Sequence, residues 1–291
     1  MRIFEPHIHM LSRVTDDYDA MALAGVRVCV EPSFWLGQAR THVGTFLDYF
    51  DAILEYETKR AAEHGVDHYC TIALNPKEAN DPRLCDGVIE ALPRYLGHPR
   101  CLAVGEVGYD SITPAEDKAV QAQVQLAAKH GLPVMVHTPH RDKRRGTERT
   151  IAVMREMRFP PDRCIIDHST EETTKMILEA GFFCGHTVYP RTKLSPERFA
   201  NLVDEFGAER MMVNSSADWG ASDALSVPKV TLELRRRGHS DETIERIVWR
   251  NPVEIYGKSG KLKLPEEAKP EAPEEKEKKS ETRAKLQDAR V

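Results

Sequence analysis

Two histidines near the start of the chain are spaced for metal binding. His7 and His9 stand two residues apart in the segment Pro-His-Ile-His-Met. If the preceding residues form a β-strand, side chains two apart point the same way, and both imidazoles leave the carboxyl end of that strand together. Alone, the pair is also consistent with polar surface at a strand end.

Four further residues with metal-ligand side chains follow later apolar runs: Glu106, His137, His168 and Asp218. Neutral imidazole nitrogen and carboxylate oxygen suit Zn²⁺ and its first-row neighbours, and a bound cation lowers the pKa of water from about 16 to about 7. Each residue singly is also explained as a helix cap or loop hydrogen-bonder. As a set with His7 and His9, they predict a site for one or two divalent ions, with Zn²⁺ favoured and Mn²⁺ or Mg²⁺ as alternatives. We expect Glu106 to bridge two ions and Asp218 to act as the proton shuttle.

These residues meet only if the apolar runs are parallel strands that end at one edge. The runs are Arg2–Phe4, Val26–Val30, His68–Leu74, Cys101–Gly105, Pro133–Val136, Cys164–Ile166, Phe182–Gly185 and Arg210–Val213. Stretches of helical character lie between them, among them Phe46–His64, Asp86–Leu96, Ala115–His130, Arg149–Arg158, Thr173–Ala180, Pro196–Phe206 and Leu225–Arg237. Buried strands alternating with helices indicate βαβ units, and a chain of this length fits an α/β fold of the (β/α)8 TIM-barrel type. Active sites of that fold lie at the carboxyl ends of the strands.

A doubly wound open sheet is the competing architecture, but no Gly-x-Gly-x-x-Gly motif follows the first predicted strand. We expect one barrel domain over residues 1–258. Residues 259–291 are nearly all Glu, Lys, Pro and Ala and offer too little apolar surface to offset chain entropy, so we predict a charged, mostly disordered tail.

Composition limits where the protein is expected to be located and what it is expected to bind. No apolar stretch approaches the roughly 20 residues of a membrane span, and the chain opens on a strand, so we expect a cytoplasmic protein without membrane contact. The 6 cysteines include no Cys-x-x-Cys pair and read as reduced core residues. A net charge of -5 argues against extended nucleic acid as a partner and leaves a small anionic substrate. A homo-oligomer stays open.

Basic and hydrogen-bonding side chains in two predicted loops are candidate substrate contacts. His140, Arg141 and Lys143 follow the fifth strand in a cationic segment, and His186, Tyr189, Arg191 and Lys193 follow the seventh. Such groups at the mouth of the barrel would neutralise a phosphate or a carboxylate. Capping and loop packing explain each of them equally well when it is taken singly.

The motifs around the predicted ligands resemble those of a known family. His7-x-His9, Gly-Glu106-Val-Gly-Tyr-Asp, Val-His137-Thr, Asp-His168-Ser and the late Asp218 are similar to the metal-site motifs of TatD-type hydrolases in the amidohydrolase superfamily. The resemblance spans Met1 to Gly257, and several loop segments look closer still to a group of predicted metal-dependent TIM-barrel hydrolases. It implies a binuclear site in which His7, His9 and Asp218 hold one metal, His137 and His168 hold the other, and Glu106 bridges. Asp218 would also take the proton of the bridging water.

We therefore predict a metal-dependent hydrolase, with a phosphoester in a small phosphorylated metabolite or at a nucleic-acid end as the favoured substrate. One alternative is a lactonase, amidase or decarboxylase of the same superfamily, because a fold does not fix its chemistry. Another is a non-catalytic binding protein that keeps the metal for stability.

Overall fold

The strands of the computed structural model, which describes residues 1–265, form one parallel sheet. The 8 strands pair in chain order, from β1 beside β2 to β7 beside β8. They are β1 (Ile3–Glu5), β2 (Val26–Pro32), β3 (Asp67–Thr71), β4 (Cys101–Gly108), β5 (Val134–His137), β6 (Cys164–Ile166), β7 (Phe183–Thr187) and β8 (Met211–Asn214). This order is that of a (β/α)8 barrel. The predicted fold is confirmed, and the doubly wound alternative is wrong because its strand order reverses part-way across the sheet.

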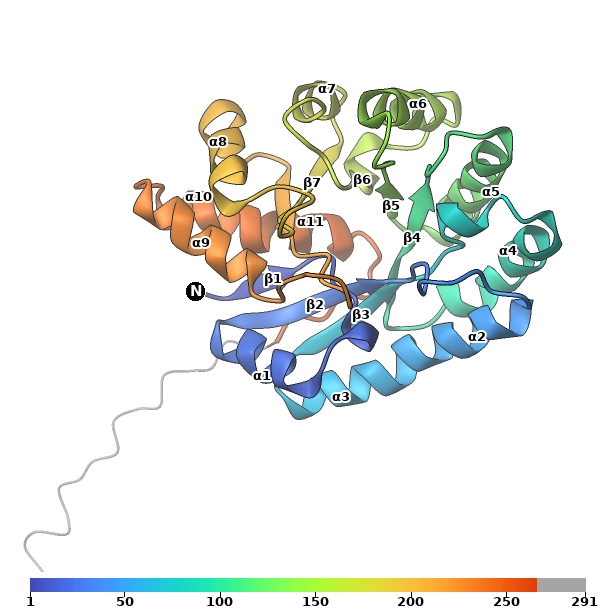
Figure 1. The fold of residues 1–291 in the computed structure, drawn as a ribbon, viewed down its shortest axis with the longest axis horizontal. Coiled ribbons are helices and arrows are strands. Elements are labelled where there is room, and N and C mark those ends of the chain that lie inside the picture. Colours follow the sequence, from blue (N-terminus) through green and yellow to red (C-terminus); the bar gives the residue numbers. More distant parts are fainter. Residues whose placement is uncertain (266–291) are drawn as a thin grey trace, which may run out of the picture.

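Helices between successive strands form a ring outside the sheet (Figure 1). The α-helices are α1 (Thr15–Leu23), α2 (Val43–Asp51), α3 (Thr58–Glu63), α4 (Pro82–Leu96), α5 (Pro114–His130), α6 (Lys143–Glu156), α7 (Thr174–Glu179), α8 (Pro196–Phe206), α9 (Ser226–Arg236), α10 (Asp241–Glu245) and α11 (Asn251–Gly257). Short 3₁₀ turns are η1 (Met10–Ser12), η3 (Pro76–Glu78) and η4 (Pro161–Arg163), and π-helical turns are η2 (Ala52–Glu57) and η5 (Arg246–Arg250). Within residues 1–265, none of the helices combines the length and the apolar character that crossing a bilayer requires.

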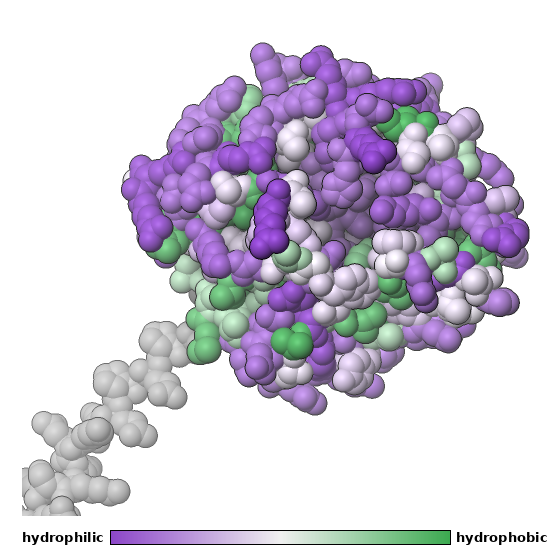
Figure 2. All heavy atoms as spheres, in the orientation of Figure 1, coloured by the Kyte–Doolittle hydropathy of each residue, from purple (hydrophilic) through white to green (hydrophobic). Residues whose placement is uncertain are grey.

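Alternation along the strands divides the buried side chains into two layers. Phe4, Val28 and Phe183 belong to a cluster that fills the barrel, whereas Cys29 and Cys184, their neighbours in sequence, pack with the surrounding helices. Successive strand residues point to opposite faces, so each strand serves both layers. The cysteines are all buried and unpaired, as predicted. On the outside, hydrophilic residues cover most of the face shown in Figure 2.

The last helices close the amino-terminal end of the barrel. Tyr256 of α11 stacks on Phe4 inside the barrel, with ring centroids 5.7 Å apart. Further on, Leu262 packs against the same cluster, and Nζ of Lys261 donates to the carbonyl oxygen of Cys101 at the start of β4 (3.1 Å). Residues 259–264, predicted as the beginning of the tail, therefore lie against the barrel, while the predicted tail from residue 266 onward is outside the described residues.

Strands β1 and β8 do not pair directly within the described residues, and the segments that follow them close the seam instead. The amide of Ser216 donates to the carbonyl oxygen of His7 (2.8 Å), and the amide of His9 donates to that of Ala217 (2.9 Å). These two backbone bonds hold the end of β8 beside the pair of histidines. The segment that carries Asp218 therefore lies next to the segment that carries His9.

Candidate metal centre

The carboxyl ends of four strands bring most of the predicted ligands together. His7 and His9 follow β1, and Glu106 lies near the carboxyl end of β4. His137 is the last residue of β5, and His168 follows β6. All are buried, with exposed fractions from 0% for His7 to 8% for His137. Burying this many ionisable groups is costly unless they are paired or bind an ion.

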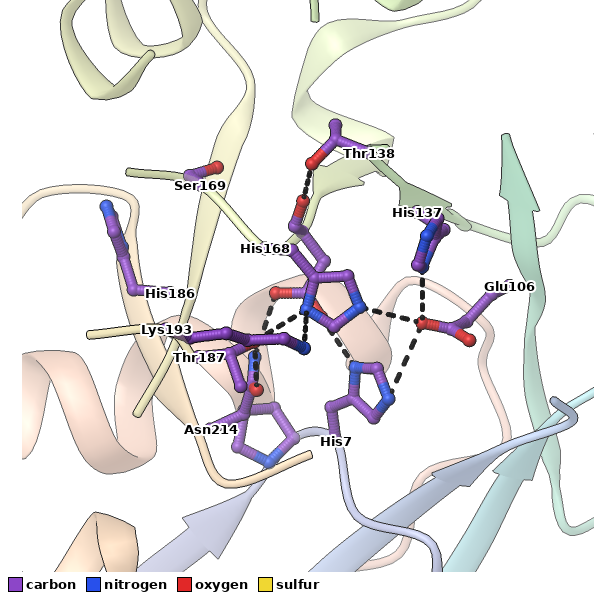
Figure 3. A network of polar contacts seen from close by, with 12 residues as sticks. His7, Glu106, His137, Thr138, His168, Ser169, His186, Thr187, Lys193 and Asn214 are labelled. Carbon is purple, nitrogen blue, oxygen red and sulfur yellow. Dashed lines mark hydrogen bonds and ion pairs between the residues drawn. The ribbon is translucent and has the colours of Figure 1, made fainter. Parts of the chain in front are cut away.

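One oxygen of Glu106 is the centre of this cluster. Its Oε1 lies 3.2 Å from Nε2 of His168, 3.5 Å from Nε2 of His7 and 3.5 Å from Nδ1 of His137. Figure 3 shows the three imidazoles turned toward this oxygen from different sides. His9 completes the group, with its Nε2 3.0 Å from Nε2 of His7. Nitrogen and oxygen donors thus converge on one small volume.

Several of these nitrogens have no hydrogen-bond partner among residues 1–265. They are Nδ1 of His9 and both ring nitrogens of His137, and all three atoms are buried. Buried polar atoms are nearly always satisfied, because leaving one unpaired costs about 1–3 kcal/mol. A divalent cation coordinated by these nitrogens would satisfy them, so the donor set fits the predicted metal.

The charges of the cluster reinforce one another. Burial raises the pKa of Glu106, but the neighbouring His7, His137 and His168 together lower it by more. The net result is a pKa well below the usual range of a glutamate. Burial and the adjacent His7 lower the pKa of His9, and burial and the ammonium of Lys193 lower that of His168. The carboxylate is therefore held ionised, while His9 and His168 are held neutral, which are the forms that bind a metal.

Asp167 belongs to the cluster and was not predicted. Atoms of His7, Glu106, Asp167 and His168 lie within 4.8 Å of one another and form a group that fits a metal ion. Oδ2 of Asp167 lies 2.5 Å from Nδ1 of His7. The available signal was its position directly before His168, but strict alternation would turn it away from the site. Because β6 ends at Ile166 and His168 has a φ of 57°, alternation does not apply at this point.

Asp218 lies at the rim of the cluster rather than in that group of four. Its Oδ1 accepts hydrogen bonds from the hydroxyl of Tyr189 (2.8 Å) and from the amide of Gly220 (2.8 Å). It lines a cavity of about 220 Å³ together with His9, Glu106, His137 and His168. Tyr189, predicted as a substrate contact, is thus a hydrogen-bond donor to Asp218.

Three of the predicted substrate contacts reach the cavities at the mouth. His140 and Lys193 line the cavity just described, and both also line an adjoining cavity of about 410 Å³, where Lys143 joins them. Nζ of Lys193 lies 3.0 Å from Nδ1 of His168, and Nζ of Lys143 donates to the carbonyl and hydroxyl oxygens of Thr138 (both 3.0 Å). Nitrogen-bearing side chains therefore border the cluster on the side of β5 to β7.

The other predicted contacts lie elsewhere. Arg141 and Arg191 are exposed, and neither lines the two cavities at the mouth. The predicted cationic loop is partly helical, because α6 begins at Lys143, and Arg144 there pairs with Glu148 on the helix surface (3.0 Å).

The structure places His186 away from the two cavities at the mouth of the barrel. Its side chain is fully buried, with Nε2 2.9 Å from the hydroxyl of Thr174 in α7 and its ring 5.3 Å from that of Phe199 in α8. It lies inside β7, where alternation points it toward the helices, while Thr187, one residue later, faces the cluster.

Comparison with known proteins identifies the family. A family model described as TatD related DNase matches residues 7–257. The chain belongs to this family. An uncharacterized metal-dependent hydrolase of Methanocaldococcus jannaschii is 25% identical over 259 residues, which cover 87% of this chain and 99% of that protein. A 3'-5' ssDNA/RNA exonuclease TatD of Citrobacter rodentium is 23% identical over 202 residues, 67% of this chain and 74% of the relative.

Solved structures share the fold of this TatD-family chain. The TatD-like protein of Archaeoglobus fulgidus superposes with a TM-score of 0.73 at 24% identity, covering 87% of this chain and 99% of that one. A phosphotriesterase homology protein of Escherichia coli, complexed with phosphate in its active site, gives a TM-score of 0.67 at 14% identity, covering 88% and 98%. The chain is therefore a TatD-like metal-dependent hydrolase whose buried His, Glu and Asp group fits a metal site.

Proposed function

We propose that this hydrolase cleaves a phosphoester bond in a small anionic substrate, using one or two divalent ions, with Zn²⁺ favoured by the nitrogen-rich donor set. The observation that carries the proposal is the convergence of three imidazoles on Oε1 of Glu106, accompanied by buried nitrogens without hydrogen-bond partners in the described part of the chain. A divalent cation bound there would act as a Lewis acid and lower the pKa of water.

The ligands divide between two halves of the cluster. In this proposal His7, His9 and Asp218 would hold one ion, His137 and His168 would hold the other, and Glu106 would serve both. Its central position among His7, His137 and His168 supports the bridging role. The placement of Asp218 beside His9 across the seam between β1 and β8 supports the first half.

Asp218 would accept the proton of the attacking water. Tyr189 and Gly220 both donate to Oδ1, which leaves Oδ2 to receive the proton. These two hydrogen bonds also fix the direction in which the carboxylate points. A positioned general base of this kind typically contributes about 10²- to 10⁴-fold in rate.

The cationic border of the cavities supports an anionic substrate. Lys193 lines both cavities beside the cluster, and Lys77 lines the smaller one. Their ammonium groups would offset the charge of a phosphoryl group next to Glu106. The phosphate in the active site of the structurally similar phosphotriesterase homology protein supports the same substrate class.

Elemental analysis of the purified chain, paired with a panel of phosphoester, lactone and amide substrates, tests the proposal. We expect bound metal and metal-dependent turnover of phosphoesters. Asp218→Asn should lower kcat by about 10²- to 10⁴-fold. Asp223→Asn is the matched control, because Asp223 lies in the same segment but receives the amide of Leu225 instead of facing the cluster (2.9 Å).

Other outcomes would contradict the proposal in different ways. Failure to bind Zn²⁺, Mn²⁺ or Mg²⁺ would remove the metal site. Metal binding with turnover of lactones or amides alone would move the chain to another reaction of its superfamily. Metal binding without any turnover, and an Asp218→Asn variant with unchanged biological function, would favour the non-catalytic alternative.

A further inference from the structure

Three buried polar side chains lie directly behind the imidazoles of His7 and His168. They are Asp167, Thr187 and Asn214, which come from the carboxyl ends of β6, β7 and β8 and are 0%, 1% and 2% exposed. None of them is one of the six ligands predicted from the sequence. Figure 3 shows Thr187 and Asn214 on the side of His168 that faces away from Glu106.

Short hydrogen bonds join these side chains into one continuous chain between the two imidazoles. Nδ1 of His7 lies 2.5 Å from Oδ2 of Asp167, and Oδ1 of Asp167 lies 2.8 Å from Nδ2 of Asn214. Oδ1 of Asn214 lies 2.9 Å from the hydroxyl of Thr187, which lies 2.7 Å from Nδ1 of His168. The chain links two histidines that are 161 positions apart in sequence through contacts between three neighbouring strands.

The acceptor-only carboxylate of Asp167 sets one consistent direction for every bond in this chain. An ionised carboxylate only accepts, so Asp167 receives N–H groups from both His7 and Asn214. The amide oxygen of Asn214 then accepts the single hydroxyl proton of Thr187. With its proton committed, the Thr187 oxygen accepts from Nδ1 of His168. In this arrangement both imidazoles carry a proton on Nδ1 and turn Nε2 toward Glu106.

The backbone is shaped to make room for the central carboxylate. A Cβ atom on Gly185 in β7 would lie 2.3 Å from Oδ1 of Asp167 and 3.0 Å from its Cγ, so any larger residue would displace it. The Asp167 backbone is fixed as well, since its amide donates to Val136 (2.8 Å) and its carbonyl accepts from the hydroxyl of Thr138 (2.6 Å). Asp167 is thus held from several sides.

We propose that Asp167, Asn214 and Thr187 form one positioning relay that aims Nε2 of both His7 and His168 at the metal centre. The inference rests on the proposed metal site but adds residues to it that touch no substrate. Partners behind a ligand histidine fix its tautomer and ring orientation, and losing one typically costs about 10- to 100-fold in metal affinity. Because one chain serves both rings, damage in its middle, at Asn214, should disturb His7 and His168 together.

Lys193 allows a different hydrogen-bond arrangement at His168, which competes with the relay. Its Nζ lies 3.0 Å from Nδ1 of His168, and an ammonium that donates there requires an Nδ1 without a proton. His168 would then carry its proton on Nε2 and donate it to Oε1 of Glu106, 3.2 Å away. The two arrangements predict opposite tautomers of His168, which makes the relay directly testable.

The first experiment reads the tautomers in the metal-free full-length chain by long-range ¹H–¹⁵N NMR of the imidazoles. We assign the two rings by comparison with His7→Gln and His168→Gln. The expected result is the Nδ1–H form for both rings, and Asp167→Asn should convert His7 to the Nε2–H form because the new amide donates to Nδ1. An Nε2–H form of His168 in the unmodified chain would overturn the relay in favour of the lysine arrangement.

The second experiment measures Zn²⁺ affinity by competition with a chelator. Thr187→Val and Asn214→Leu should each weaken binding by about 10- to 100-fold, and Thr187→Ser should restore it. Thr150→Val is the matched control, because Thr150 is equally buried but donates to Gly146 within α6 (2.9 Å). Unchanged affinity in Thr187→Val would overturn the proposal. If the unmodified chain bound no Zn²⁺, the proposed function would fail, while the tautomers would still decide the relay.

Discussion

Two partly buried lysine side chains at the mouth of the barrel, Lys143 and Lys193, have lowered pKa values. Nζ of Lys143 is enclosed between the start of α6 and the end of β5, and its hydrogen bonds to Thr138 involve no carboxylate. Burial, followed by the charge of Lys193, lowers the pKa of Lys143 from its ordinary value of 10.5 to about 7. Burial also lowers the pKa of Lys193.

The depressed pKa of Lys143 gives a stability that depends on pH. Between pH 7 and 10.5 the unfolded chain binds more protons at this lysine than the folded chain does, so stability rises with pH across that window. Relative to Lys143→Met, the unmodified chain should gain up to about 2 kcal/mol in free energy of unfolding between pH 7 and pH 9. Urea unfolding at the two pH values measures the gain.

Lys118→Met is the control for this prediction, because the side chain of Lys118 is 76% exposed and its charge is accessible to water in both states. Its difference from the unmodified chain should not change with pH. A Lys143→Met variant that follows the unmodified chain in parallel from pH 7 to pH 9 would show that burial does not shift this lysine.

For single residues, position at the end of a strand predicts most side chains of the site. The prediction fails where the inward and outward alternation of side chains was misjudged. His7, His9, Glu106, His137 and His168 lie together because the ends of parallel strands meet at one edge of the barrel. His186 points toward the helices because β7 continues to Thr187, two residues beyond the predicted end of this strand at Gly185. Asp167 was missed because a local φ of 57° at the next residue breaks the alternation, and no sequence pattern reveals such an angle.

Helix α5 shows how local sequence fixes the element that follows a site-bearing strand. Thr113 is its N-cap, and the side chain of Thr113 accepts from the amide of Glu116 (3.1 Å) while the carboxylate of Glu116 accepts from the amide of Thr113 (3.1 Å). Removing the cap with Thr113→Ala should cost about 1 kcal/mol in free energy of unfolding. Thermal or urea unfolding measures the loss, with Thr113→Ser expected to retain most of the stability.

A separate result would contradict the capping role of Thr113. Its hydroxyl also donates to Asn80 in the preceding connection (2.6 Å), so a loss of stability in Thr113→Ala has two possible origins. Asn80→Ala removes that contact and the hydrogen bond from Nδ2 of Asn80 to Glu116 (2.9 Å), but it leaves the bond between the amide of Glu116 and the hydroxyl of Thr113 in place. If Asn80→Ala cost as much as Thr113→Ala, the tertiary contact rather than the cap would account for the effect.

Strands and helices were predictable where the apolar pattern was continuous, and less predictable where charged residues interrupt it. The predicted strands fall on the observed ones because continuous apolar runs are needed to fill both faces of a parallel sheet. The sequence predicts helix α6 from Arg149, but the helix begins at Lys143, since its first six residues include three basic side chains and have no apolar periodicity. That basic segment was therefore mistaken for a loop.

For the whole molecule, sequence length and the repeated alternation of strand and helix were enough to predict a barrel. They did not predict how its ends are sealed. The seam between β1 and β8 is closed by backbone bonds from Ser216 and His9, which depend on the path of two irregular segments. The amino-terminal end is sealed partly by residues after 258, whose Lys-rich composition concealed their contacts.

Those contacts predict different effects for two truncations of the chain. Ending the chain at residue 265 keeps Leu262 against the barrel-filling cluster and the bonds between the Tyr69 hydroxyl and Lys263, at 2.9 and 3.1 Å. We expect its free energy of unfolding to match that of the full chain, since residues 266–291 contain few apolar side chains to bury.

Ending the chain at residue 258 should instead lower the free energy of unfolding by about 1–3 kcal/mol. It exposes the surface under Leu262 and leaves the hydroxyl of Tyr69 and the carbonyl oxygen of Cys101 without the partners that Lys263 and Lys261 provide. Urea unfolding of both truncations and of the full chain makes the comparison. Because the sealed end lies opposite the metal centre, Zn²⁺ affinity should be equal in all three, and equal stability in all three would mean that residues 259–265 do not hold the barrel closed.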